Sequence, residues 1–333
     1  MFISVLELFK IGIGPSSSHT MGPMLAAGKF RARVEQFLAV DKTDSPLKLH
    51  CTLKGSLAFT GKGHATDRAI TLGLHGYDPE ALVDQDVDTL VTQLWRKRDI
   101  SLNDKQAVHF HPKEDIVFDR GQPLAEHPNG MIFELRDQHG RMVFTETYFS
   151  IGGGFISTPA EISGLKAPLK MESAMSFPYG FDSANAMMQM SKDSGLSIAA
   201  MKRMNECKQH SDVELNQGLD AIWAAMQRCI ETGLAASGTL PGGLNLPRRA
   251  RALFEQLETA PQEANLNDWL CAYAMAVNEE NADGHMVVTA PTNGAAGVIP
   301  AVLYYFVKHE GGSIEQVRDF LLTAAAIGGL IKY

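Results

Sequence analysis

The chain has 333 residues, which is long enough for two domains of ordinary size, because single hydrophobic cores stop growing at about 250–300 residues. Hydrophobic residues make up 45% of the chain and charged residues 20%, a composition typical of folded globular proteins that excludes the disordered and fibrous classes. The net charge is −8 and no stretch gathers Lys and Arg, so we expect no nucleic-acid partner.

The sequence predicts a cytoplasmic protein with no membrane partner. No basic leader precedes the first apolar residues, and the longest apolar run, "FLLTAAAIGGLI", is too short to span a bilayer. The four cysteines form no C-x-x-C or C-x-x-H pair; they are Cys51, Cys207, Cys229 and Cys271. We expect four reduced, mostly buried thiols, without disulfides and without a bound metal.

The first third of the chain alternates helix and strand signals. Apolar residues recur at helical spacing from Met24 to Leu38, and Pro23 suits the first turn of that helix. Residues 47–55, "LKLHCTLKG", alternate apolar and polar side chains and predict a half-buried strand. A short glycine turn, "TGKGHATD", then leads into a helix that ends near Gly76. The predicted order is therefore strand, turn, helix.

A change of pattern near residue 155 indicates a domain boundary. Residues 130–137 and 141–151 predict a hairpin of two strands, and three glycines follow at 152–154. Beyond them the strand signals almost vanish.

The rest of the chain is dominated by helical patterns. Ser211 and Glu214 form a capping box, and an apolar stripe at helical spacing follows them. The predicted fold class is therefore α+β in two domains. Residues 1–155 form an N-terminal α/β domain with a small mixed sheet, and residues 156–333 form a C-terminal all-α domain.

The first candidate site is the turn "GPSSSHT", which leads into the first predicted helix. Backbone N–H groups at a helix start attract anions, and the hydroxyls add hydrogen bonds. The hydroxyl-bearing residues are Ser16, Ser17, Ser18 and Thr20. His19 can accept a proton there or donate one. An ordinary N-cap uses only one of these hydroxyls, and the nucleophile-elbow pattern of a Ser-His hydrolase is missing. We therefore expect a carboxylate, phosphate or substrate site at this turn.

A second turn, "GKGHATD", places His64, Thr66 and Asp67 between a strand and a helix. Ligands of α/β sheets bind at the carboxyl ends of strands, where this turn is expected to lie. The turn lacks the spacing of a P-loop or a dinucleotide-binding loop, so a nucleotide is disfavoured. Taken alone, His64 fits a surface loop as well as a proton-transfer site. Two such turns in one domain favour the second interpretation.

Two further motifs carry polar residues in turns. "EHPNG" contains His127 before a proline, and a hairpin connection explains this motif without any site. "VVTAPTNGAAG" presents Thr292 and Asn293 at an apparent helix start, among small residues that let the backbone approach a bulky group. Tight helix packing accounts for the Ala and Gly residues of this motif, but not for the Thr-Asn pair.

In this order the motifs resemble the bacterial single-chain L-serine dehydratases of the iron-sulfur-dependent type. The matching stretches are "SVLELFKIGIGPSSSHTMGPM", "GSLAFTGKGHATD", "EHPNGM", "TYFSIGGGF", "LPGGL" and "TAPTNGAAGVIPA". They span residues 4–301, so the resemblance covers nearly the whole chain. Six motifs in the same order are hard to obtain by chance.

The resemblance implies an enzyme with an N-terminal α/β domain and a helical catalytic domain that holds a [4Fe–4S] cluster. Members of the family convert L-serine to pyruvate and ammonia without pyridoxal phosphate. The cluster serves as a Lewis acid that binds the hydroxyl and carboxylate of the substrate. The resemblance further implies a homo-oligomer, a dimer, whose small-molecule partner is L-serine.

The resemblance also implies roles for single residues. His19 and His64 are the leading candidates for proton transfer, and it does not decide which of them is the base. The implied substrate contacts are Ser16, Ser17, Ser18, Thr20, Thr66 and Asp67, with His127 and Ser150 as second candidates and Thr292, Asn293 and Gly294 on the side of the cluster.

One departure from the family concerns the cluster. The family's cluster cysteines follow the stretch that resembles "FLLTAAAIGGLIKY", and this sequence stops at Tyr333. None of the four cysteines lies in a family cluster motif or shows iron-sulfur spacing. We therefore expect the cluster ligands to be absent from this chain, which would be a fragment that is inactive by itself.

Two other functions stay open from the residues alone. A pyridoxal-phosphate lyase would need a Schiff-base lysine beside a phosphate-binding loop, and Lys62 is the one candidate. An amino-acid-binding or sensing module would need only the anion-binding turn of the first domain.

Overall fold

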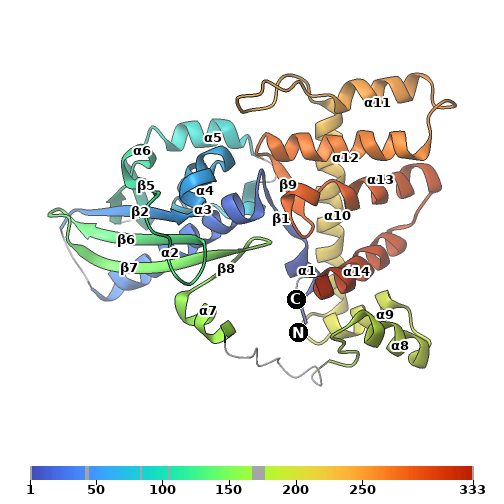
Figure 1. Cartoon of the computed structure of the whole chain (residues 1–333), viewed down its shortest axis with the longest axis horizontal. Coiled ribbons are helices and arrows are strands. Elements are labelled where there is room, and N and C mark those ends of the chain that lie inside the picture. Colours follow the sequence, from blue (N-terminus) through green and yellow to red (C-terminus); the bar gives the residue numbers. More distant parts are fainter. Residues whose placement is uncertain (1, 42–44, 83–84, 104–105, 167–176, 332–333) are drawn as a thin grey trace. The chain divides into compact units, whose positions relative to one another are not determined.

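The computed structural model describes residues 2–41, 45–82, 85–103, 106–166 and 177–331. The chain divides into two compact units (Figure 1). The sheet unit comprises Gly12–Lys166 and Gly284–Met286, and the helical unit comprises Met1–Ile11, Ala167–Asp283 and Val287–Tyr333. The fold is thus mixed α/β, with its main sheet in the N-terminal part and mostly helices in the C-terminal part.

The sheet unit is built on a seven-stranded mixed sheet around β2 (Leu47–Gly55). The strand order is β3-β4-β2-β6-β7-β8, and β5 also pairs with β2. β2 runs antiparallel to β6 and parallel to β4 and β5. Buried and half-buried side chains alternate along all of β2, which confirms the predicted strand. The other strands are β3 (Asp99–Asn103), β4 (Gln106–His109), β5 (Ile116–Asp119), β6 (Asn129–Asp137), β7 (Met142–Gly152) and β8 (Phe155–Ser157).

Helix α2 (Gly22–Val40) covers one face of this sheet. Its apolar stripe packs against β6, β7 and β8, and Pro23 lies in its first turn as predicted. Phe30 of α2 meets Phe133 and Tyr148 of the sheet in a buried core. The other helices of this unit are α3 (Ser56–Thr60), α4 (Thr66–Leu74), α5 (Val87–Leu94), α6 (Pro112–Asp115) and α7 (Pro159–Lys166).

Helices α2 and α4 approach each other closely at Gly73. A Cβ atom added to Gly73 would lie 2.2 Å from the carbonyl oxygen of Met24 and 2.8 Å from Cβ of Ala27. Both separations are far below van der Waals contact, so only glycine permits this approach. α2 follows the turn that contains His19, and α4 follows the turn that contains His64. The contact between the two helices therefore brings the two turns together.

The helical unit consists of helices around α10 (Asp212–Ala235). The capping box of Ser211 and Glu214 is present as predicted, and α10 packs against α11, α12, α13 and α14. The other helices are α1 (Val5–Leu8), α8 (Ala184–Ser194), α9 (Ile198–Glu206), α11 (Ala250–Thr259), α12 (Leu266–Ala282), α13 (Val298–Glu310) and α14 (Ile314–Ile331).

Strand β9 (Met286–Thr289) contradicts the expectation of helices alone after residue 155. It pairs with β1 (Lys10–Ile13) in a two-stranded sheet. All four residues of β9 are buried, so no alternation of polar and apolar side chains marks the strand in the sequence. The prediction of an all-α second domain was therefore wrong for residues 286–289.

A buried ion pair holds the residues that precede α1. Lys202 and Glu206 are almost fully buried in α9, with Nζ 3.0 Å from the carboxylate. The Glu206 carboxylate accepts hydrogen bonds from the Val5 amide at 2.7 Å and the Ser4 hydroxyl at 2.8 Å, and the Lys202 ammonium donates to the Ile3 carbonyl. The two charges thus satisfy each other and the backbone of residues 3–5.

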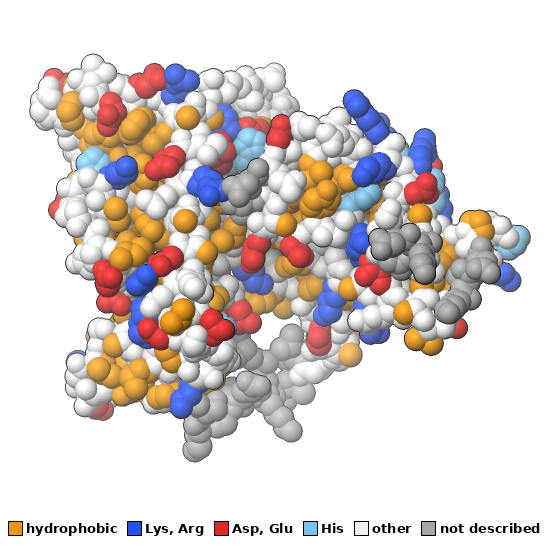
Figure 2. Space-filling view, turned by 180° about the vertical axis from the view of Figure 1, so that it is seen from behind, with side chains coloured by type: hydrophobic (Ala, Val, Ile, Leu, Met, Phe, Trp, Pro, Cys, Tyr) orange, Lys and Arg blue, Asp and Glu red, His pale blue; other side chains and the backbone are white. Residues whose placement is uncertain are grey.

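The surface of the helical unit carries exposed apolar side chains (Figure 2). On α13 and α14 they include Val298, Val302, Ile327 and Ile331. Among the described residues, no helix has both the length and the hydrophobicity needed to cross a bilayer.

The close approach of α2 and α4 can be tested by replacing its glycine. We expect Gly73→Ala to lower the free energy of unfolding by about 1–3 kcal/mol, because the new Cβ meets backbone atoms that cannot yield. Gly28 lies in the same interface, and its added Cβ would be 3.8 Å from the nearest atom, so Gly28→Ala is the matched control. Urea unfolding measures both variants. Equal stability of Gly73→Ala and the wild type would contradict the described helix contact.

Candidate active site

The turn "GPSSSHT" forms a π-helical segment, Ser17–Met21, that runs directly into α2. Ser16 is its N-cap, and its hydroxyl accepts a hydrogen bond from the His19 amide at 3.2 Å. The amides of Ser17 and Ser18 in the first turn have no hydrogen-bond partner among the described residues. Two free N–H groups at the start of a long helix can bind an anion, which supports the predicted use of this turn.

The turn "GKGHATD" is more ordered than the simple glycine turn predicted. β2 ends at Gly55, the short helix α3 follows, and Gly61–His64 form a 3₁₀ turn before α4 begins at Thr66. His64 Nδ1 lies 2.9 Å from the carbonyl oxygen of Thr60. Because a carbonyl oxygen can only accept, Nδ1 carries the hydrogen in the neutral ring. Nε2 of His64 therefore keeps a free lone pair and can accept a proton.

His19 and His64 lie side by side. Their ring centroids are 4.8 Å apart at an interplanar angle of 43°. His19 Nδ1 lies 2.8 Å from the Ser18 hydroxyl, and Nε2 lies 3.0 Å from the Ser56 hydroxyl. Burial lowers the pKa of His19, and a positive charge on His64 lowers it further. Both effects favour the neutral ring of His19, the form that a proton acceptor or a neutral hydrogen-bond donor requires.

Two threonines link the two turns through their hydroxyl groups. Thr20 Oγ1 donates to the backbone carbonyl of His64 at 2.7 Å, and Thr66 Oγ1 donates to the backbone carbonyl of His19 at 2.5 Å. Both threonines are fully buried. The substrate-binding role predicted for them stays a prediction, as does that of Asp67, whose carboxylate accepts the Arg68 amide at 3.0 Å.

His127 and Ser150 belong to a second group at one end of β6 and β7. His127 Nδ1 accepts a hydrogen bond from the Asn129 amide at 3.1 Å, and burial lowers the pKa of His127. The Asn129 side chain donates to the Ser150 carbonyl at 3.1 Å. Asn129, which links these two candidates, was not singled out from the sequence, although it stands in the motif "EHPNG".

The Ser150 hydroxyl is buried without a hydrogen-bond partner among the described residues. It packs against the first residue of α2, where a Cβ atom on Gly22 would lie 2.1 Å from Ser150 Oγ. An unpaired buried hydroxyl costs about 1–3 kcal/mol, so its presence here calls for a reason. A ligand of the adjacent turn would supply a partner.

The three site residues predicted near residue 293 differ in exposure. Asn293 is buried, with its side-chain oxygen 2.7 Å from the Thr289 hydroxyl and its nitrogen 2.9 Å from the Asn281 side-chain oxygen. Thr292 and Gly294 on either side of it are exposed. Their roles stay predictions, because this loop belongs to the helical unit, whereas His19 and His64 belong to the sheet unit.

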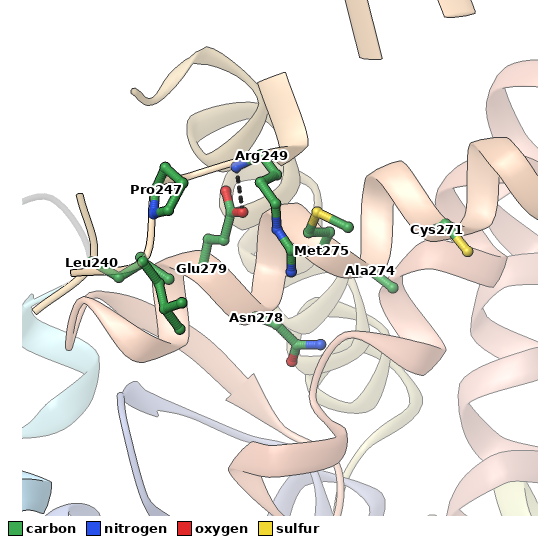
Figure 3. Close-up of a pocket in the computed structure, with 9 residues that line it drawn as sticks. Leu240, Pro247, Arg249, Cys271, Ala274, Met275, Asn278 and Glu279 are labelled. Atoms are coloured by element: carbon green, nitrogen blue, oxygen red, sulfur yellow. Dashed lines mark hydrogen bonds between the residues drawn. The ribbon is translucent and has the colours of Figure 1, made fainter. Parts of the chain in front are cut away.

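The helical unit contains a cavity of about 530 Å³ beside the "LPGGL" motif (Figure 3). Leu240, Pro247 and Met275 give it an apolar wall, and Arg249 and Asn278 present polar groups to it. The Glu279 carboxylate accepts the Arg249 amide at 2.7 Å and fixes this part of the wall. Apolar walls with a few polar groups are typical of small-molecule sites. No cavity was predicted here from the sequence, because "LPGGL" was quoted only for the family resemblance and Arg249 and Asn278 were not singled out.

The cysteines do not form a metal site among the described residues. Cys51 and Cys229 are buried, and burial raises the pKa of both thiols. Cys207 at the end of α9 and Cys271 on α12 are exposed, so the expectation of mostly buried thiols was wrong for these two. No group of three or more His, Cys, Asp or Glu side chains in the described part of the chain could hold a metal ion. These residues therefore do not fit an iron–sulfur cluster, which needs several thiolates converging on one point.

The contact between the two histidine rings predicts a change in titration. We expect His64→Gln to raise the pKa of His19, because the variant removes a positive charge that opposes protonation of the neighbouring ring. Titration of the imidazole signals by NMR measures the pKa. His139→Gln in the exposed turn between β6 and β7 is the control and should leave His19 unchanged. An unchanged pKa in His64→Gln would contradict the pairing of the rings.

The unpaired hydroxyl of Ser150 predicts an unusual stability effect. We expect Ser150→Ala to keep or increase the free energy of unfolding, by up to about 1 kcal/mol, because the variant removes an unsatisfied buried group. Ser157 on β8 is also buried, but its hydroxyl lies 3.3 Å from the Glu161 carboxylate, so Ser157→Ala should destabilise the protein. Urea unfolding distinguishes the two. Equal losses in both variants would mean that the Ser150 hydroxyl has a partner.

Comparison with known protein families matches both halves of the chain. Residues 4–161 match the family model of the serine dehydratase beta chain, and residues 193–333 match that of the serine dehydratase alpha chain. The L-serine dehydratase of Streptomyces coelicolor is 41% identical over 336 residues, which is 100% of this chain and 72% of that protein.

Two other relatives agree with this assignment. The L-serine dehydratase of Haemophilus influenzae is 36% identical and L-serine dehydratase 1 of Escherichia coli is 38% identical, each over 99% of this chain and 72% of the relative. Identity at this level over nearly the whole chain, with both family models in order, makes this chain a member of the L-serine dehydratase family.

Proposed function

We propose that the protein is an L-serine ammonia-lyase, which converts L-serine to pyruvate and ammonia. The observation that carries the proposal is the pairing of His19 with His64 at 4.8 Å, next to a helix start with free amides. The names of the relatives support the substrate. The reaction needs an anion site and a base close together. The turn before α2 supplies the free amides, and the turn before α4 supplies His64 as the base.

The residues of the sheet unit have separate tasks in this proposal. The free amides of Ser17 and Ser18 bind the substrate carboxylate, helped by the Ser16 and Ser18 hydroxyls. His64 Nε2 takes the α-proton, since its Nδ1 is held by the Thr60 carbonyl. Neutral His19, between the Ser18 and Ser56 hydroxyls, holds or returns a proton near the substrate.

The chemistry balances as an elimination followed by hydrolysis. Loss of the α-proton and of the β-hydroxyl group, together one water, leaves an enamine. The enamine tautomerises to an imine, and one water hydrolyses it to pyruvate and ammonia. No electron acceptor is consumed.

The cofactor of the proposal is the [4Fe–4S] cluster that the resemblance implies. The four cysteines of this sequence do not fit it, so its ligands are not among them. We therefore expect no turnover from this polypeptide by itself. The proposal also includes the domains 1–155 and 156–333, a cytoplasmic location and a homodimer, which rest on the sequence and the resemblance.

The proposal can be tested on a chain extended at Tyr333 by the corresponding remainder of the Streptomyces coelicolor relative. After anaerobic treatment with iron and sulfide, we expect pyruvate to form from L-serine. His64→Gln should lower the rate by about 10²–10⁴-fold, the range typical of a lost general base, and leave the visible absorption unchanged. His139→Gln is the control and should retain the wild-type rate.

Three outcomes would contradict the proposal. Near-normal rates in both His64→Gln and His19→Gln would remove the assigned base. A yellow chromophore that borohydride bleaches would favour a pyridoxal-phosphate enzyme, with Lys62, whose ammonium lies 5.4 Å from the Phe118 ring centroid, as the lysine to examine. Binding of L-serine without pyruvate formation in a cluster-loaded protein would favour a sensing module.

A further inference from the structure

The two crossed hydrogen bonds of Thr20 and Thr66 link the histidine turns in a reciprocal way. Thr20 directly follows His19, and Thr66 lies two residues after His64; each threonine donates to the backbone carbonyl of the histidine in the other turn. A single bond would leave the turns free to rotate about it. Two bonds that cross fix both the separation and the relative rotation of the turns.

Both threonine hydroxyls already have hydrogen-bond partners and are shielded from solvent. Thr20 Oγ1 donates to the His64 carbonyl and also accepts the Ser16 amide at 3.2 Å. Thr66 Oγ1 would lie 2.9 Å from a Cβ atom on Gly61, so the backbone of its own turn closes over it. Both residues have 0% exposure. A substrate therefore has no path to either hydroxyl in this arrangement.

The residue type suits a geometric task. The two heavy atoms on Cβ of threonine leave few rotamers within a helix, so the hydroxyl direction follows from the backbone. Thr66 is the first residue of α4, and Thr20 lies in the π-helical turn before α2. Through these hydroxyls, the positions of α2 and α4 determine where the backbones of the two histidines lie.

We propose that Thr20 and Thr66 are positioning residues that set the distance between the His19 and His64 rings and make no contact with substrate. This replaces the substrate-binding role predicted for them from the sequence. The consequence for catalysis rests on the proposed function, whereas the effect on the two rings does not.

The test measures how strongly the two histidines influence each other in the ligand-free polypeptide. The quantity is the change in the His19 pKa caused by His64→Gln, determined by NMR titration in each background as a double-mutant cycle. We expect this change to fall by at least about half in Thr20→Val or Thr66→Val, because the rings move apart and their interaction weakens with distance. Thr20→Ser and Thr66→Ser keep the hydroxyl, so the change in the His19 pKa should remain as large as in the unmodified background.

Thr71 supplies a matched control. It is also buried and lies in α4, but its hydroxyl donates to the Asp67 carbonyl of its own helix at 2.8 Å. Thr71→Val should therefore leave the histidine coupling unchanged. Where a valine variant does not fold, the cysteine variant at the same position, a weaker donor, should give an intermediate coupling.

A second measurement separates positioning from substrate binding. In the cluster-loaded extended chain, Thr20→Val and Thr66→Val should lower kcat by about 10–100-fold with little change in KM, as expected for misplaced reacting groups. A raised KM with kcat retained, and intact histidine coupling, would overturn the proposal and assign the hydroxyls to the substrate. Reduced coupling without any pyruvate formation would overturn the proposed function and leave the positioning role standing.

Discussion

The absence of a side chain at Gly73 is the constraint on which the rest of the site depends. It lets α4 approach the backbone of α2 near Met24, and each helix begins where a histidine turn ends. Helices are stiff, so their contact fixes the turns at their starts. Helix packing brings the His19 and His64 rings near each other, and the hydroxyls of Thr20 and Thr66 then set the distance between them.

The elements that could be predicted from the sequence are those whose signal lies within a few neighbouring residues. Alternation marked β2, a capping box marked the start of α10, and two strand patterns marked the β6–β7 hairpin. The elements that were not predicted depend on contacts with residues far away in the sequence. Strand β9 is buried on both sides and shows no alternation, and the glycine turn "TGKGHATD" gave no sign of its 3₁₀ segment Gly61–His64.

The candidate site divides in the same way. The motifs singled out His19 and His64, and the structure brings the two rings together. The sequence could not show that the Thr60 carbonyl selects the ring nitrogen of His64 that carries the hydrogen. Nor could it show that the hydroxyls of Thr20 and Thr66 point to the histidine carbonyls, because the direction of a hydroxyl is decided by the packing around it and not by the residue type.

The buried pair of Lys202 and Glu206 gives the first residues of the chain an unusual status. Amino-terminal residues of most proteins fray and tolerate trimming. Here the backbone of Ile3 and Val5 supplies further hydrogen-bond partners to two paired charges that are almost fully buried. Deleting these residues would leave the ion pair in place but remove the hydrogen bonds that it makes to the backbone and to the Ser4 hydroxyl. Residues 3–5 thus belong to the interior of the helical unit, because they complete the hydrogen bonds of a buried ion pair.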